Sequence, residues 1–523
     1  MTFRLRALRA VVLLAGFHLM GVGLLAAMAV LDWLLVTRLL TEQAAWFEGT
    51  VLAVTALLAV TIVRGMVTSL RAGRLGPAPA AVAITPQEQP RLWEEVRAAA
   101  RAAGERAPDE LFLVAEVNAG VAEHGRLLGL LPGRRRMSLG LPLLTGLTVP
   151  QLRAVLAHEF GHFAHGDTRL GGLTMRGRAA LVHTVRAFET GDTWLHHPVG
   201  RLYTAYARMF LQASHSTARR QELVADQVAA RHAGREATAA ALRATQVLEA
   251  AHRRYLATYA TLGEPLAALP PVGEVGGGFR HLLAARSTQQ LARLAAESRP
   301  SRPHPYDSHP PTPERIALIE ALPPGDDNQQ NRPDGPDGPE ALSLLREPDR
   351  LFAALEARTL PPEASTMRRM SWDDLVLARA VADADDWSRP LRLAVARTLR
   401  SSEPDGELPG LEEILDAFDR GLLWPEIADR MPKPPQAARL TGQSARNFLR
   451  PRIFDALAGL VHLRLVALGQ ATADIAWAGQ PGLALPEAWE KGMDDALDAA
   501  TADTPDTTPL RTLLTSHTPT PPP

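Results

Sequence analysis

Two histidines and a glutamate stand close together in the run His158-Glu159-Phe160-Gly161-His162. Residues four apart lie one turn above each other on the same face of an α-helix, so His158 and His162 can direct two imidazoles at one ion. Glu159 lies beside them, where its carboxylate can take a proton from a water that the metal has made acidic. The pattern H-E-x-x-H therefore predicts a zinc site with peptidase chemistry, provided that the segment is helical.

The residues before the motif carry the signals of a helix start. Thr148 is a good N-cap, Gln151 completes a capping box, Pro150 suits the first turn, and an apolar stripe begins at Leu152. Gly161 costs a helix on the order of 1 kcal/mol relative to alanine, yet it leaves room for something close to the backbone. We predict one helix over the run 152–167.

A third ligand is expected downstream, because catalytic zinc uses three protein ligands with an open fourth position, and His2Glu is a standard set. The stretch 216–226 is rich in Ala, Leu, Arg and Gln and is predicted to be helical, with Glu222 and Asp226 four apart on one face. Glu222 is the candidate ligand, and Asp226 the expected acceptor for the second ring N–H of His158. The alternative is that both carboxylates form a solvated charged face.

Three ordered motifs carry a family resemblance: HEFGH at 158–162, ELVAD at 222–226 and SHPPTPER at 308–315. Together they resemble the HtpX-like and CaaX prenyl endopeptidase family of gluzincin metallopeptidases. The resemblance implies a membrane-associated zinc metalloendopeptidase with a zincin-like catalytic domain and one Zn²⁺ per chain. It implies His158, His162 and Glu222 as the metal ligands.

The resemblance also implies roles for residues around the metal. Glu159 would be the general base and acid, and Asp226 would support a ligand from behind. His309 would stabilise the oxyanion, and Arg315 would be a structural or substrate-orienting group. Asn118, in an Asn-Ala pair upstream of the metal helix, would belong to a substrate-binding strand.

The N-terminus indicates a membrane anchor over residues 1–75. Residues 11–36 are apolar except for His18 and Asp32, long enough to cross a hydrocarbon core of about 30 Å. A second hydrophobic segment, 47–67, predicts a second transmembrane helix and hence a helical hairpin; for it the alternative is an amphipathic or buried hairpin. A cleavable signal peptide is the competing interpretation of the first segment, but its apolar core would be only about 7–15 residues long.

Basic residues flank the anchor on both outer sides and are sparse in its connecting loop. They are Arg4, Arg6 and Arg9 before the first segment and Arg64, Arg71 and Arg74 after the second, against Arg38 between them. The positive-inside rule then predicts a multi-pass protein of the cell (inner or plasma) membrane, with both termini and the catalytic domain cytoplasmic. The absence of cysteine fits that compartment, and a net charge of −1 gives no argument for nucleic acid.

Composition divides the rest of the chain. Residues 80–322 are expected to form the zinc metallopeptidase domain, mainly α with a small sheet (α+β), containing a helix at 87–103 and strands at 111–117 and 137–144. The interval 168–215 has no apolar span and is expected to form soluble amphipathic helices, serving as a lid. A disordered linker at 323–340, a helical C-terminal domain at 341–500 and a disordered tail at 501–523 are predicted to follow.

The sequence as a whole favours a membrane-anchored zinc-dependent endopeptidase that acts on peptide or protein substrates, in membrane-protein quality control or processing. One alternative is a catalytically silent or latent zinc-binding scaffold that recruits a protein partner through the C-terminal helices. Another is a zinc hydrolase with non-peptide substrates. Fold-level analogy does not choose among these functions.

Overall fold

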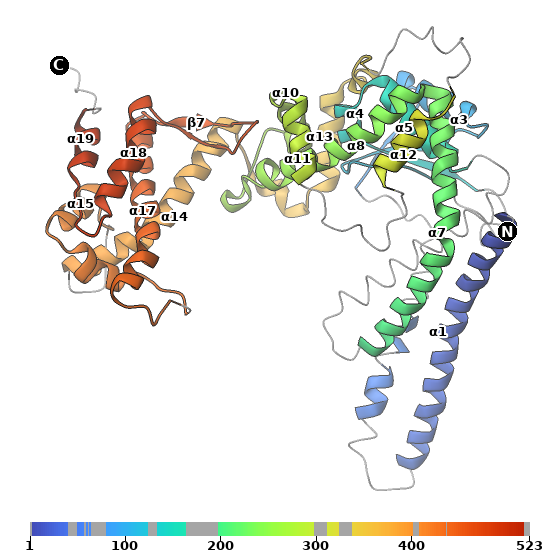
Figure 1. The fold of residues 1–523 in the computed structure, drawn as a ribbon, viewed down its shortest axis with the longest axis horizontal. Helices are drawn as coiled ribbons and strands as arrows, with labels where there is room; N and C mark the ends of the chain where they lie inside the picture. Colours follow the sequence, from blue (N-terminus) through green and yellow to red (C-terminus); the bar gives the residue numbers. More distant parts are fainter. Residues whose placement is uncertain are drawn as a thin grey trace. The chain divides into compact units, whose positions relative to one another are not determined.

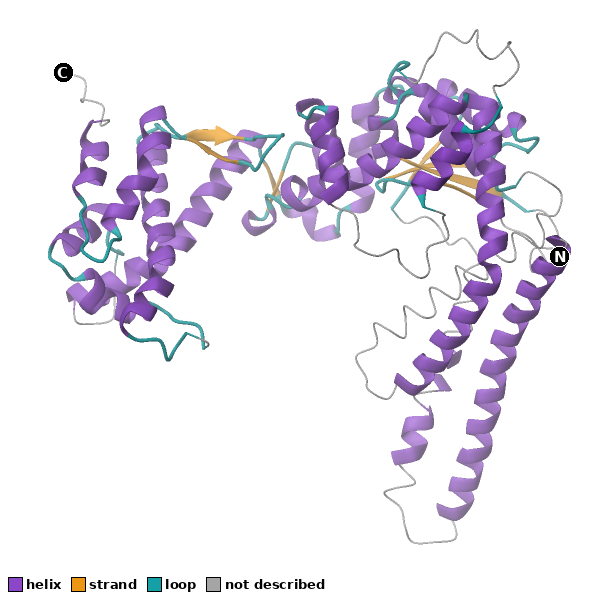
Figure 2. Cartoon of the chain, in the orientation of Figure 1, coloured by secondary structure: helices purple, strands orange, loops and turns teal. Residues whose placement is uncertain are grey.

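The computed structural model describes residues 3–39, 50–56, 59–60, 62–63, 80–123, 133–163, 197–297, 311–323, 337–400, 407–435 and 437–516 (Figure 1). The chain forms two compact units: residues 1–253 with 287–360, and residues 254–286 with 361–523. Both are mainly helical with small sheets, which confirms the predicted fold class (Figure 2). Two segments lie in the other unit than expected. Residues 254–286, expected in the peptidase domain, belong to the second unit, and residues 341–360, expected in the C-terminal domain, belong to the first.

The first unit contains a four-stranded sheet in the order β1-β2-β4-β3. Its strands are β1 (Val82–Ile84), β2 (Glu110–Val114), β3 (Ala119–Glu123) and β4 (Arg135–Gly140). Strand β2 runs parallel to β4 and antiparallel to β1, while β3 runs antiparallel to β4 at the sheet edge. The second predicted strand ends at Gly140 rather than at 144, because Pro142 lies in the first turn of α4 (Leu141–Gly146).

Among the helices of the first unit, α5 (Val149–Gly161) and α7 (His197–Ala233) carry the proposed site. Beside these, α1 (Phe3–Leu39) and α4, further helices of this unit are α3 (Pro90–Ala102), α8 (Arg235–Tyr255), α11 (Thr288–Glu297), α12 (Thr312–Glu320) and α13 (Pro348–Thr359). Helix α3 begins at Pro90, inside the predicted helix 87–103, and packs on α5. Leu92, Val96, Leu152, Leu156 and Phe160 are fully buried on the two helices, so a shared apolar core fixes α5 in place.

Residues 337–360 belong to the first unit because their backbone is bonded into it. Val149 donates to the carbonyl of Pro339 at 2.8 Å, and Ala341 donates to the carbonyl of Leu147 at 2.8 Å. The Gln89 side chain accepts from the Arg346 N–H at 2.7 Å. The end of the predicted linker therefore holds the start of α5; residues 324–336 of that linker lie outside the described residues.

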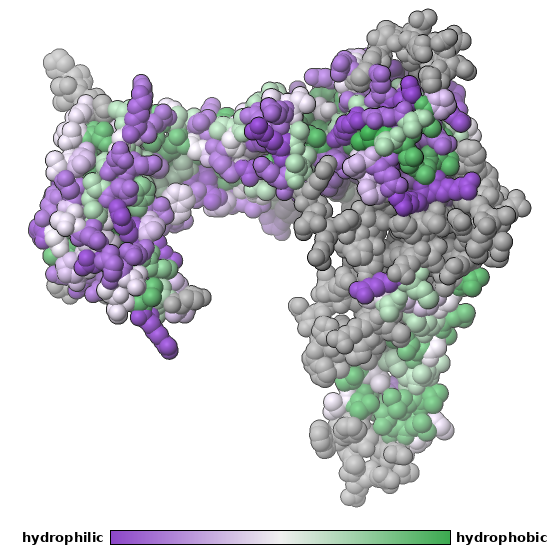
Figure 3. Space-filling view, viewed as in Figure 1, coloured by the Kyte–Doolittle hydropathy of each residue, from purple (hydrophilic) through white to green (hydrophobic). Residues whose placement is uncertain are grey.

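Helix α1 (Phe3–Leu39) is the one helix among the described residues that is long and apolar enough to cross a membrane. Its segment Leu19–Thr37 has a mean hydropathy of 2.2 and is 6% buried, and apolar side chains gather on its visible surface (Figure 3). Residues 50–56, in the second predicted segment, are also helical. Thr55 there donates to the Asp32 carboxylate of α1 at 2.6 Å.

Of the predicted lid region, 168–215, the structure describes only the part from residue 197 onward. Residues 168–196 lie outside the described residues, while 197–215 form the first half of α7, a continuous helix of 37 residues. Helix α7 runs beside α1 (Figure 1). A Cβ at Gly16 of α1 would collide with the Tyr206 hydroxyl. This half of α7 is therefore packed on the apolar helix.

The second unit is helical apart from two-stranded pairings of β5 with β6 and of β7 with β8. Its elements are β5 (Ala268–Leu269), α9 (Glu274–Gly277), α10 (Phe279–Ala285), β6 (Arg368–Arg369), α14 (Trp372–Arg400), α15 (Leu411–Asp419), α16 (Ala428–Arg430), α17 (Gly442–Ala467), β7 (Thr472–Asp474), β8 (Gly482–Ala484), α18 (Glu487–Ala500) and α19 (Thr508–Ser516). Helices α14 and α17 pack along each other around an apolar core.

Residues 254–286 join the second unit through aromatic packing. Tyr255, Tyr259 and Phe279 are fully buried. The Tyr259 ring stacks on Trp477 with centroids 4.7 Å apart, and the Tyr259 hydroxyl donates to the carbonyl of Ala476 at 2.7 Å. These contacts tie the segment to the turn between β7 and β8 and explain the shifted boundary.

Order extends into the predicted tail. Leu510 of α19 is fully buried, and Arg511 pairs with Asp416 at 2.6 Å and Asp419 at 2.9 Å on α15. Where a disordered tail was expected from 501, the chain instead passes through a turn into the packed helix α19, which ends at Ser516; residues 517–523 lie outside the described residues.

Candidate metal centre

Helix α5 begins as the sequence predicted. The Thr148 hydroxyl accepts from the Gln151 N–H at 3.4 Å, and the Gln151 side chain accepts from the Thr148 N–H at 3.1 Å, which confirms the capping box. The last helical residue is Gly161, and His162 forms the C-cap, so the helix is shorter than the predicted run to 167. His162 N–H still donates to the His158 carbonyl at 3.3 Å, which keeps the two histidines one turn apart.

The motif gathers three donors. The ligand atoms of His158, Glu159 and His162 lie within 4.8 Å of one another, and the two imidazole centroids are 4.7 Å apart. Glu159 is half-buried, so its carboxylate can meet a water molecule or a substrate. Its place beside the imidazoles suits a general base.

Helix α7 brings Glu222 close to the same two imidazoles. Glu222 Oε2 lies 3.6 Å from His158 Nε2, and Glu222 Oε1 lies 3.8 Å from His162 Nε2. The Glu222 side chain is buried, 1% exposed. The alternative that the sequence left open, a solvated charged face, therefore does not apply to Glu222.

These separations fit a metal ion. Two donors each 2.0–2.1 Å from zinc at a tetrahedral angle are about 3.3 Å apart, close to the 3.6 and 3.8 Å observed here. Two neutral imidazoles and a carboxylate are also the donor types of catalytic zinc. Of the two glutamates, the buried Glu222 faces both Nε2 atoms and is suited to be the ligand, which leaves the more accessible Glu159 for acid–base work.

Gly161 makes this meeting of helices possible. A Cβ at Gly161 would lie 2.7 Å from the Ala225 Cα on α7. The glycine and the small alanine therefore let α5 and α7 approach closely between Glu222 and Asp226. Sequence analysis anticipated a close neighbour of Gly161 but missed Ala225, for which the small residue inside the ELVAD motif was the available signal.

Asp226 supports His158 from behind. Its Oδ1 lies 3.0 Å from His158 Nδ1, as the sequence led us to expect, and Arg315 of α12 bonds both carboxylate oxygens, at 2.6 and 2.8 Å. Although burial opposes ionisation, hydrogen bonds from Arg315 and His158 hold the pKa of Asp226 at about 2. A permanently ionised Asp226 keeps the His158 proton on Nδ1 and leaves Nε2 toward Glu222.

Arg315 is buried, 6% exposed, and its Nη1 lies 3.5 Å from Glu222 Oε2. Its Nη2 is also 3.4 Å from His158 Nδ1, near the limit of hydrogen bonding, so we assign the orientation of the ring to Asp226. Of the two roles expected for Arg315, this geometry favours the structural one. His309 lies outside the described residues, and its oxyanion role stays a prediction.

Asn118 directly precedes the edge strand β3, and its carbonyl accepts from the Gly140 N–H of β4 at 2.7 Å. A Cβ at Gly140 would clash with the carbonyls of Glu116 and Asn118, so the glycine permits this close turn. Strand β3 also contacts α5. The edge of the sheet thus lies next to the metal helix.

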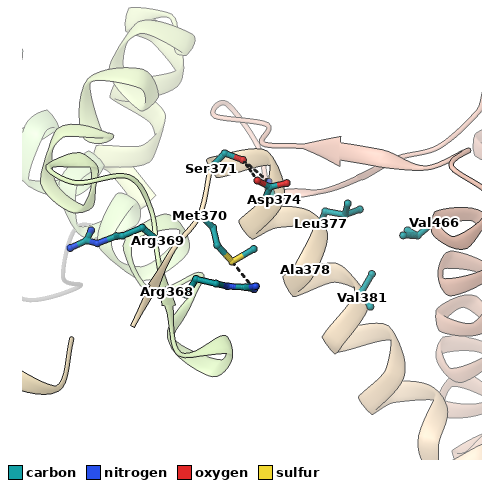
Figure 4. Close-up of a pocket in the computed structure, with 9 residues that line it drawn as sticks. All are labelled: Arg368, Arg369, Met370, Ser371, Asp374, Leu377, Ala378, Val381 and Val466. Atoms are coloured by element: carbon teal, nitrogen blue, oxygen red, sulfur yellow. Dashed lines mark hydrogen bonds between the residues drawn. The ribbon is translucent and has the colours of Figure 1, made fainter. Parts of the chain in front are cut away.

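A separate pocket of about 550 Å³ lies in the second unit, between the start of α14 and Val466 of α17 (Figure 4). Arginines, Ser371, Asp374 and apolar side chains line it, and Ser371 Oγ donates to Asp374 Oδ2 at 2.7 Å. No histidine is among its lining residues. The combination of metal donors and a base therefore belongs to the first unit.

Comparison with known proteins agrees with this placement. Residues 86–322 match the model of peptidase family M48, a segment that includes α5, α7, α12 and the residues discussed above. No curated protein and no solved structure was found to match the chain. The family resemblance carried by the three sequence motifs is confirmed.

Proposed function

Because residues 86–322 match the model of peptidase family M48, we propose that the protein is a zinc-dependent endopeptidase anchored in a membrane. The observation that carries the proposal is the buried Glu222 facing His158 and His162, with Asp226 behind one imidazole and Glu159 beside both. His158, His162 and Glu222 would hold one zinc ion. When bound, zinc would activate a water molecule and polarise the substrate carbonyl.

The side chains of this chain would then divide the remaining work. Glu159 accepts a proton from the attacking water and later delivers it to the leaving amine. Asp226, held ionised by Arg315, fixes the proton on His158 Nδ1. His309 stabilises the oxyanion, a role that rests on its place in the HPP motif.

The edge strand supports an endopeptidase. Strand β3 pairs with β4 along one side, and no other described strand pairs with it. An extended peptide can add to such an edge through its main chain, so the substrate needs no free terminus at the site. In this proposal Asn118 lies at the start of the substrate strand.

The anchor would be a hairpin of α1 and the second hydrophobic segment. The hydrogen bond from Thr55 to Asp32 supports it, because polar groups inside a bilayer require partners. Both termini and the catalytic domain would be cytoplasmic at the cell membrane. Membrane-proximal proteins or peptides are then the substrates, in quality control or processing.

The test is cleavage of a peptide library whose members are blocked at both ends, with a chelator and zinc add-back. We expect internal cleavage that the chelator abolishes and zinc restores, because an endopeptidase needs neither terminus. Cleavage of peptides with free ends alone would make the protein an exopeptidase. Turnover of esters without peptide cleavage would favour a non-peptide hydrolase, and bound zinc with no turnover would favour the latent scaffold.

A further inference from the structure

Strand β3, next to the metal helix, has little apolar side-chain area to hold it. Four of its five residues are Ala119, Gly120, Val121 and Ala122, and all five are only half-buried. A strand of this kind is fixed mainly by its ladder with β4, and the ladder ends at Glu123, which lies opposite Arg135. A side chain that holds Glu123 in place would therefore fix the position of this end of β3.

Beside a pair of Glu123 with the exposed Arg106 at 3.2 Å, the buried Arg135 side chain provides the main restraint. Its Nη2 donates to Glu123 Oε2 at 3.0 Å, and its Nη1 and Nη2 both donate to Glu105 Oε2 at 3.1 Å. Nη1 also donates to the carbonyl of Arg106 at 2.8 Å. With Arg135 only 4% exposed, these bonds form away from solvent and have a defined geometry.

The same guanidinium reaches the metal helix. Its Cζ lies 4.6 Å from the ring centroid of Phe163, the residue after His162. Arginine over an aromatic ring is attracted to it, and the contact is strongest away from water. Arg135 thus touches both the end of β3 and the residue that follows a proposed zinc ligand. We name Arg135, Glu105, Glu123 and Phe163 the Arg135 cluster.

We infer that Arg135 is a positioning residue for substrate: it fixes the spacing between the β3 edge and the C-terminal end of α5, and thereby the path of a peptide past the metal site. This rests on the proposed function. The cluster lies beyond the zinc donors, so its loss leaves the metal site intact while the peptide no longer meets both surfaces at the correct distance.

A matched control stands on the neighbouring residues. Arg136, next in β4, pairs with Glu110 on β2, which lies directly opposite it in the parallel ladder. This pair joins β4 to the interior strand β2, whereas the Arg135–Glu123 pair joins β4 to the edge strand β3. Glu110→Gln and Arg136→Lys therefore weaken ion pairing of the same kind. Arg136 lies opposite Ala122 of β3 in the ladder, but the bond of its side chain is to β2.

The experiment compares Glu123→Gln and Arg135→Lys with those controls in the full-length, zinc-loaded protein. Because a displaced β3 edge would weaken main-chain contacts that the peptide makes equally in the ground state and the transition state, we expect KM for long blocked peptides to rise about tenfold in the two cluster variants. The kcat should stay within about twofold, since the acid–base group is untouched. Zinc content should equal that of the wild type, and the control variants should keep the wild-type KM.

A second readout does not depend on turnover. In a Glu159→Gln background, binding of a fluorescein-labelled peptide should weaken on adding Glu123→Gln but not on adding Glu110→Gln. Equal KM and equal peptide affinity in cluster and control variants, with only a lower Tm, would make Arg135 purely structural and overturn the inference. A wild type that neither cleaves nor binds any peptide overturns the proposed function, and the inference with it.

Discussion

At the scale of residues, the central feature is a series of contacts that ends on an imidazole. Arg315 bonds both oxygens of Asp226, and Asp226 contacts His158 Nδ1 at 3.0 Å. Partners of this kind fix the tautomer and raise the basicity of a ligating histidine. We therefore expect Asp226 to contribute to metal affinity without being a ligand.

Asp226→Asn should lower zinc affinity by about 10–100-fold, the range typical of partners behind a ligand. The amide keeps the shape but loses the charge that holds the His158 proton. Competition with a fluorescent chelator measures this. Glu320→Gln is the control, because it breaks an exposed pair with Arg243 between α8 and α12. Equal zinc affinity in both variants would contradict the role given to Asp226.

His252 on α8 predicts a pH dependence. It is buried, and burial lowers its pKa from 6.5 to about 4. The unfolded chain takes up this proton near pH 6.5 while the folded chain stays neutral, so stability present above pH 6.5 is lost as the pH falls toward 4. At 1.36 kcal/mol for each pH unit the loss approaches about 3 kcal/mol.

We therefore expect His252→Leu to flatten the acid side of the stability curve. The measurement is Tm from pH 8 to 4.5 for wild type and variant. The wild type should lose Tm relative to the variant below pH 6.5. A difference between the two proteins that is constant with pH would rule out a buried neutral His252.

At the scale of elements, the site depends on how closely α5 and α7 approach. Each helix alone carries only part of the donor set. The contact of Gly161 with Ala225 brings the parts together. Helix α7 also runs from this contact to the apolar helix α1, where Tyr206 meets Gly16. One continuous helix thus links the apolar helix α1 to a proposed zinc ligand.

Gly161→Ala should separate the two helices, since its Cβ would lie 2.7 Å from the Ala225 Cα. Overpacking of this kind costs about 1–3 kcal/mol. We expect a lower Tm and weaker zinc binding, because Glu222 moves away from both histidines. Gly410→Ala is the control, as nothing lies within 4 Å of that Cβ. Unchanged zinc affinity in Gly161→Ala would contradict this account of the helix contact.

Local signals predicted the site well. Thr148 and Gln151 indicated the start of the helix. The spacing of four residues predicted that His158 and His162, and likewise Glu222 and Asp226, lie on one face of their helix. Contacts between distant segments could not be predicted. Arg135 joins parts of the chain from residues 105 to 163. The Tyr259 ring packs on Trp477, more than 200 residues later, which no local pattern indicates.

At the scale of the whole molecule, the segment that matches the family model is divided between the two compact units. The match covers residues 86–322, yet 254–286 within it belong to the second unit. Tyr255, Tyr259 and Phe279 of this segment are fully buried. Some of the partners of this segment lie beyond residue 360: Trp477 stacks on Tyr259, and the Trp372 side chain lies 3.5 Å from the Glu274 carboxylate.

A chain that ends at Leu360 should therefore fold poorly. Exposing buried aromatic side chains costs about 1.5–3 kcal/mol for each. We expect a lower Tm, aggregation and faster proteolysis within 254–286. A chain that ends at Ser516 is the control and should behave like the wild type. A truncated protein with wild-type Tm and zinc content would show that the first unit is independent.

The most direct test of the central claim is one set of purified proteins measured for zinc content and for cleavage of the same blocked peptide: wild type, Glu159→Gln and Glu222→Ala. Near-stoichiometric zinc is expected in the wild type and in Glu159→Gln, with loss of zinc in Glu222→Ala. Cleavage should fall by about 10²–10⁴-fold in Glu159→Gln, as for a general base, and should disappear in Glu222→Ala. Wild-type turnover in Glu159→Gln, or full zinc content in Glu222→Ala, would contradict the proposed zinc peptidase centre.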